Sequence, residues 1–231
     1  MRFYGIDSTY IILVLPAILL AFWAQFRVKA TFDKYSQVRS ASGMTGAQAA
    51  RMILDANGLQ HVQVERISGK LTDHFDPRSN VVRLSDSVYA VPSVAAIGVA
   101  AHETGHAIQY EQGYSPMKLR AAIIPITNIG ANLSIPLIMI GFALNFESLV
   151  LVGIVLFATL AVFQLITLPV EFNASGRAIE ALENGGRLSE QEVKGAKKVL
   201  SAAAMTYVAA LVTTLAQLLR FVLLFAGRRR D

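Results

Sequence analysis

The sequence predicts a mainly α-helical integral membrane protein with about four transmembrane helices and a small α+β insertion between the first two. Only 16% of its 231 residues are charged and 54% are hydrophobic, whereas about a quarter of an ordinary soluble domain is charged. Four runs without any charge are each long enough to cross a bilayer, which takes roughly 20 helical residues. Short β-rich stretches lie between the first two runs. The uncharged runs are residues 8–26, 121–146, 148–170 and 199–219.

The composition excludes several classes of site and partner. The chain has no cysteine, which rules out disulfides, iron–sulfur clusters, cysteine-ligated zinc and thiol catalysis. Its formal net charge is +5, and in so hydrophobic a chain this basic excess fits the surface of an anionic bilayer. We therefore expect the lipid bilayer as a partner and no nucleic acid.

The first uncharged run is expected to be an uncleaved anchor. Asp7 precedes it, and its end, Ala-Phe-Trp-Ala-Gln-Phe, lacks the small-x-small pattern of a signal-peptidase site. Trp23 and Phe26 also suit the aromatic belt at a membrane surface. A cleaved signal peptide is the alternative.

Basic residues gather on one side of the predicted spans. They follow the first run, precede the second and lie between the third and fourth, whereas the 144–148 turn has none. The positive-inside rule then makes this a multi-pass protein with both basic regions in the cytoplasm. Arginines 228–230 disagree, because four spans would place them outside, and a re-entrant last segment is the alternative. The predicted regions are an anchor (1–29), a cytoplasmic region (30–120), a transmembrane hairpin (121–170), cytoplasmic helices (171–198) and a last transmembrane helix with a basic tail (199–231).

Two capping boxes and one alternating run predict the elements outside the spans. Thr45 with Gln48, and Ser189 with Glu192, each have the spacing that opens a helix. Residues 62–67 alternate between apolar and polar side chains, and turn formers separate them from a second β-rich run. The expected elements are helices over 45–57, 92–112 and 171–183, a hairpin of strands 62–67 and 81–84, and a helix from Ser189 into the last span.

The 92–112 helix carries an H-E-x-x-H motif, His102-Glu103-Thr104-Gly105-His106. Residues four apart share a helix face with Cβ atoms about 5–6 Å apart, so His102 and His106 are able to bind one zinc ion. Glu103 lies beside that face, where it serves as the base for a metal-bound water. The alternative is a pair of structural histidines with a solvated glutamate. The apolar surroundings make that costly, because buried imidazoles and carboxylates need partners.

A catalytic zinc site needs a third protein ligand and an open position for water. Only His61 and His74 remain among the histidines, so the third ligand is expected to be a carboxylate. Glu171 is the best candidate, because two spans separate it from His106 and return it to the same side of the membrane. The alternative is a surface charge that ends a span. Glu111, Glu180 and Glu183 are interpreted as solvated or facing away.

With these motifs the chain resembles the bacterial membrane zinc metallopeptidases of the YugP-like family. The resemblance covers nearly the whole chain. It implies a zincin-like region that carries the motif helix, Zn²⁺ as cofactor, and a bacterial inner membrane location. The positive-inside rule places this region, and with it the active site, on the cytoplasmic side. The matching stretches are LTDHFDP (71–77), VRLS (82–85), AAHETGHAIQ (100–109) and LPVEFNAS (168–175).

A more distant resemblance concerns the stretch that begins at Glu171. It is similar to the E-x-x-A-D motif of HtpX-type membrane peptidases, which implies Glu171 as a ligand. Where those enzymes have aspartate this chain has Ser175, which can offer a ligand histidine only a neutral hydrogen bond. The resemblance also places His74 near the site, where it is a candidate donor to the developing oxyanion. A surface histidine bonded to Asp76 is the alternative.

Arg177 and His61 are the remaining residues that bear on the site. Arg177 shares the predicted helix of Glu171, so it is a candidate for stabilising an oxyanion or a substrate carboxylate, or else a basic residue at the headgroups. His61 is expected at the surface.

The sequence therefore predicts a membrane-embedded zinc-dependent endopeptidase that cleaves membrane or juxtamembrane proteins with a metal-activated water. His102, His106 and Glu171 are the expected ligands, Glu103 and His74 the expected catalytic residues, and Ser175 a supporting residue. A non-catalytic metal-binding scaffold or regulator is the main alternative, and a small transporter is disfavoured by the absence of an internal repeat. The substrate is a protein or peptide, and the oligomeric state stays open.

Overall fold

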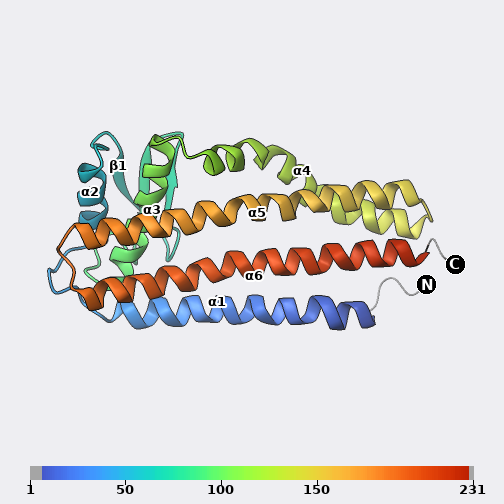
Figure 1. Ribbon diagram of the computed structural model, residues 1–231, viewed down its shortest axis with the longest axis horizontal. Helices are drawn as coiled ribbons and strands as arrows, with labels where there is room; N and C mark the ends of the chain where they lie inside the picture. Colours follow the sequence, from blue (N-terminus) through green and yellow to red (C-terminus); the bar gives the residue numbers. More distant parts are fainter. Residues whose placement is uncertain (1–6, 229–231) are drawn as a thin grey trace. The chain divides into compact units, whose positions relative to one another are not determined.

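The computed structural model describes residues 7–228 and is mainly helical (Figure 1). Its elements, in chain order, are a π-helical turn η1 (Tyr10–Val14), α1 (Leu15–Ser36), α2 (Gly46–Ala56), β1 (Gln63–Ile67), β2 (His74–Asp76), β3 (Val81–Ser85), α3 (Val94–Glu111), α4 (Ser115–Ala143), α5 (Glu147–Asn184) and α6 (Glu190–Arg228). Two of the C-terminal arginines of the predicted basic tail, Arg229 and Arg230, lie outside the described residues.

Four helices among the described residues are long and apolar enough to cross a membrane, as the uncharged runs predict. They are Tyr10–Ser36, Ser115–Ala143, Glu147–Asn184 and Glu190–Gly227, and at most 28% of the most apolar window of each is buried. Many large apolar side chains of these helices are exposed, among them Phe22, Ile126 and Val155, which suits lipid rather than water. The turn predicted at 144–148 lies between α4 and α5.

The chain forms two compact units. The first consists of the described residues up to Gln25, Leu119–Leu168, and the residues from Thr206 onward. Its buried core is small and comes from α4, α5 and α6. Gly153 allows close packing there, because a Cβ at this position would lie 2.9 Å from the backbone oxygen of Ser134.

The second unit, Phe26–Lys118 with Pro169–Met205, holds the larger core. The helix α2 opens on the predicted capping box, since Thr45 accepts from the Gln48 amide and Gln48 bonds back. The helix α3 begins after the N-cap Ser93 and lies beside the sheet (Figure 1). Both helices bury their apolar faces with β3, where Val82 and Leu84 are fully buried.

The sheet differs from the predicted hairpin of strands 62–67 and 81–84. Its order is β1-β3-β2, so these two strands do pair, but in parallel: Gln63 lies opposite Val81. The turn-rich residues between them include a third strand, β2, which pairs antiparallel with β3. About a dozen residues are enough to return the chain for a parallel pair, and β2 occupies part of that connection.

A second correction concerns the ligand-bearing segment. The prediction of a separate helix over 171–183 is wrong, because α5 continues from Glu147 to Asn184 with Pro169 inside it. Proline removes one helical hydrogen bond but does not always end a helix. Glu171 is therefore anchored in the middle of a long helix rather than at its first turn.

Candidate metal centre

Two helices of the second unit bring the predicted ligands together. His102 and His106 lie one turn apart on α3, and Glu171 lies on α5. One ligand atom from each falls within 4.8 Å of the other two. Glu171 Oε2 is 3.3 Å from His102 Nε2 and 3.5 Å from His106 Nε2, and its side chain is only 3% exposed.

These distances suit a shared metal ion. Two ligands of a tetrahedral zinc, each about 2.0–2.2 Å from it, lie roughly 3.3–3.6 Å apart. A carboxylate and two imidazole nitrogens are also a donor set that zinc favours. Three such atoms facing each other need either protons or a cation between them, because their lone pairs repel. The residues present therefore fit the ion.

The close approach of the two helices depends on Gly105. A Cβ at this position would lie 2.5 Å from the backbone oxygen of Ala174, three residues after Glu171. Ala174 is itself fully buried. The second x of the H-E-x-x-H motif is thus the point at which α5 packs directly against α3.

A buried glutamine that the sequence analysis missed holds His106 in place. Gln109 Nε2 donates to the Val170 carbonyl (2.8 Å) and to Asn173 Oδ1 (2.9 Å). Since a carbonyl only accepts, the amide orientation is fixed and Oε1 faces His106 Nδ1 at 3.0 Å. That nitrogen must then carry the proton, which leaves the Nε2 lone pair directed at Glu171. The spacing of three from His106 was the one signal available in the sequence.

His102 has a different partner on its Nδ1 side. Ser175 Oγ lies 3.1 Å from this nitrogen, so the serine occupies the supporting position that the resemblance implied. The partners of both imidazoles, a hydroxyl and an amide, are neutral. Such groups orient a ligand histidine without adding charge.

Glu103 is held by the sheet. Its Oε2 accepts a hydrogen bond of 3.1 Å from the backbone N–H of Phe75 on β2. The residue is 9% exposed, at the limit of burial, and it lies next to His102 in the chain.

Burial disfavours a charged His106 imidazole. The contact with Glu171 and the charges of Glu103 and Glu171 outweigh this effect, so the pKa of His106 is raised.

His74 lies in β2 rather than in a loop, and it is not one of the three grouped ligands. Its Nδ1 is 2.9 Å from the Thr72 carbonyl. The bond to Asp76 given as the alternative is not the one the structure has, since this nitrogen contacts Thr72 and the Asp76 carboxylate accepts from Ser79 and Arg83. A role for His74 with an oxyanion stays a prediction.

The preceding residue, Asp73, was not singled out from the sequence. It accepts hydrogen bonds from the Ser85 N–H (2.7 Å) and hydroxyl (2.9 Å), which tie the start of β2 to β3. Burial and the charge of Glu103 raise the pKa of Asp73, while its bonds to Ser85 oppose that shift. It therefore belongs to the surroundings of Glu103.

The other candidates lie apart from the ligands. Arg177 donates to Asn173 Oδ1 (2.7 Å) and to Gln112 Oε1 (2.6 Å), so it links α5 to α3 beside the Gln109 bonds. His61 is exposed, as expected, 3.8 Å from Glu111. Glu180 and Glu183 are also exposed.

Comparison with known proteins identifies the family of the chain. The family model described as "Putative neutral zinc metallopeptidase" matches residues 10–226. The chain is 50% identical to "Putative membrane protease YugP" of Bacillus subtilis (strain 168) over 222 residues, which is 96% of this chain and 99% of that protein. No solved structure matches. The chain therefore belongs to this family of neutral zinc metallopeptidases.

Proposed function

We propose that this protein is a zinc-dependent membrane endopeptidase in which His102, His106 and Glu171 hold the metal. The observation that carries the proposal is the approach of Glu171 Oε2 to both imidazole Nε2 atoms, at 3.3 and 3.5 Å. Bound zinc would polarise the peptide carbonyl and lower the pKa of a coordinated water toward about 7.

Glu103 is the proposed general base. It takes the proton of the attacking water and passes it to the leaving amine, so no covalent bond to the enzyme forms. The Phe75 hydrogen bond restrains its carboxylate while the proton moves. A purely structural metal site, as in a scaffold or regulator, would not need a carboxylate at this position.

The substrate is proposed to bind along β2. This is an edge strand of the sheet, and the Phe75 N–H points out of the sheet toward Glu103. An extended peptide added at this edge would run past Glu103, which supports cleavage of unfolded or juxtamembrane segments. His74 is retained as a candidate oxyanion donor from the same strand.

The proposed location of the site is the cytoplasmic side of a bacterial inner membrane. The support is the lysines and arginines near the predicted spans, within residues 27–39, 118–120 and 177–198, set against their absence at 144–148. A reporter fused after Lys118 should be cytoplasmic, and one placed at Asn145 should be external. A cytoplasmic reporter at Asn145 would overturn this orientation.

The activity is tested by pairing a base variant with a ligand variant. Glu103→Gln should lower peptide hydrolysis by about 10²–10⁴-fold while zinc stays near stoichiometric, because the ligands are intact. Glu171→Ala should lose both zinc and activity, whereas the exposed Glu180→Ala keeps both. Unchanged hydrolysis by Glu103→Gln, in protein free of wild type, would remove the role of Glu103 as general base, and no hydrolysis by the zinc-loaded wild type would remove the peptidase proposal.

A further inference from the structure

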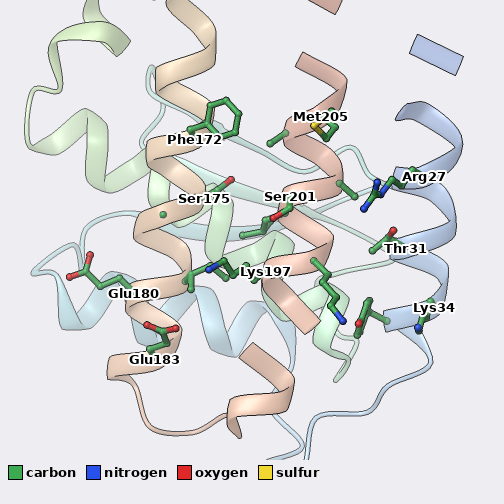
Figure 2. Close-up of a pocket in the computed structure, with 17 residues that line it drawn as sticks. Arg27, Thr31, Lys34, Phe172, Ser175, Glu180, Glu183, Lys197, Ser201 and Met205 are labelled. Atoms are coloured by element: carbon green, nitrogen blue, oxygen red, sulfur yellow. The ribbon is translucent and has the colours of Figure 1, made fainter. Parts of the chain in front are cut away.

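A cavity of about 840 Å³ lies in the second unit between α1, α5 and α6 (Figure 2). Ser175 contributes to its wall, and the same residue contacts His102 Nδ1. The nitrogen that faces Glu171 is Nε2, on the other side of the imidazole ring. The cavity therefore lies behind the ligand histidine, away from the face proposed to hold metal and substrate.

The charges around this cavity are mostly positive. Arg27 and Lys34 come from α1, and Lys197 and Lys198 come from α6. Two carboxylates, Glu180 and Glu183, also line it, at the end away from Phe172 and Met205 in Figure 2. Hydroxyl groups from α1 and α6 add further hydrogen-bonding capacity.

The cavity also changes from polar to apolar along its length. Phe172 and Met205 lie at one end, with Arg27 near them (Figure 2). From these residues α1, α5 and α6 each continue into a long uncharged run. A negative head and an apolar tail, the combination found in an anionic lipid, complement this arrangement.

We propose that this cavity binds the headgroup of an anionic phospholipid. The cations of α1 and α6 face the phosphate, and the acyl chains leave past Phe172 and Met205. Basic residues at a membrane surface favour anionic lipid, and a concave pocket with a few placed polar groups makes such binding selective. This inference does not depend on the peptidase activity.

The test is lipid retention by the full chain in mixed phosphatidylglycerol and phosphatidylcholine nanodiscs, read by native mass spectrometry after metal removal. Each cation strengthens anionic lipid binding roughly fivefold, so Lys197→Gln/Lys198→Gln should weaken phosphatidylglycerol retention about 30-fold. The matched control Arg187→Gln/Lys194→Gln removes two charges outside the cavity and should leave retention unchanged. Because the protein is metal-free, failure of the peptidase proposal would not affect the result.

A second variant fills the cavity without changing its charge. Gly176 lines the cavity, and a Cβ there would meet nothing within 4 Å, so Gly176→Leu should fold and block lipid. Equal phosphatidylglycerol retention in the wild type, the lysine variant and the leucine variant would overturn the proposal. Equal loss in the charge control would assign the effect to general surface charge. Displacement of the lipid by inorganic phosphate would identify a soluble anion site instead.

Discussion

Replacing Gly105 with alanine should disrupt the metal centre from outside its ligand set. The new Cβ would lie 2.5 Å from the Ala174 carbonyl oxygen, whereas ordinary contact begins at 3.4 Å. The clash is with backbone, so no side chain is able to rotate away. The helix α5 must therefore retreat from α3 by the 0.9 Å difference between these two distances.

A movement of this size exceeds what the centre tolerates. Metal–ligand distances hold to within about 0.2 Å, and Glu171 lies three residues from Ala174 on the displaced helix. Loss of the carboxylate from the ligand set should weaken zinc binding by at least the roughly 100-fold that loss of a supporting residue causes. Overpacking should also lower the free energy of unfolding by about 1–3 kcal/mol.

The assay combines zinc content, peptide hydrolysis and thermal unfolding of the purified protein in detergent. Gly176→Ala is the matched control, because it makes the same change on α5 at a position with open space. This variant should keep its zinc, and its free energy of unfolding should rise by up to about 1 kcal/mol because alanine has the higher helix propensity. Full zinc and activity in Gly105→Ala would show that this glycine does not set the helix spacing.

Two other residues give separate tests. Gln109→Leu should lower zinc affinity about 10- to 100-fold, because His106 loses the bond that orients it. The control Gln112→Leu loses only a bond to Arg177 and should keep the zinc affinity of the wild type. Equal zinc affinities in the two variants would remove the positioning role of Gln109. Hydrogen bonds from Ser79 and then Arg83 hold the pKa of Asp76 below its usual value. That stabilisation is present above the usual carboxyl pKa and is lost as the pH falls through the lowered one. Asp76→Asn should therefore destabilise the protein at neutral pH, and a difference from wild type that does not shrink as the pH falls below the usual carboxyl pKa would contradict this.

The sequence predicted the helices well because their signals are local. Uncharged runs and the two capping boxes mark the spans and the starts of α2 and α6, and Ser189 does bond Glu192 as expected. The strand pairing was predicted poorly because β2 has only three residues and lies among turn formers. The alternation of apolar and polar side chains that marks a strand needs a longer segment to be recognised. Without β2, the parallel pairing of β1 with β3 could not be predicted.

The site was predictable to the extent that chemistry and spacing define it. His102 and His106 were predicted as ligands because they lie four residues apart on a helix. Glu171 was predicted because few other donors exist and because two spans return it to the side of His106. Gln109 was missed because a glutamine has no characteristic chemistry. Its role appears only once the Val170 carbonyl and Asn173 of another helix lie beside it.

One helix pair positions the candidate ligands, and one strand positions Glu103. Gly105, Gln109 and Ser175 each act across the contact of α3 with α5, so that single contact sets the geometry of the three candidate ligands. The sheet contributes at a different point, where the Phe75 N–H restrains Glu103. Ligand geometry and base geometry thus rest on separate packing surfaces. A change in β2 should therefore alter the proposed proton transfer while leaving the candidate ligands in place, whereas a change at Gly105 or Gln109 should displace them.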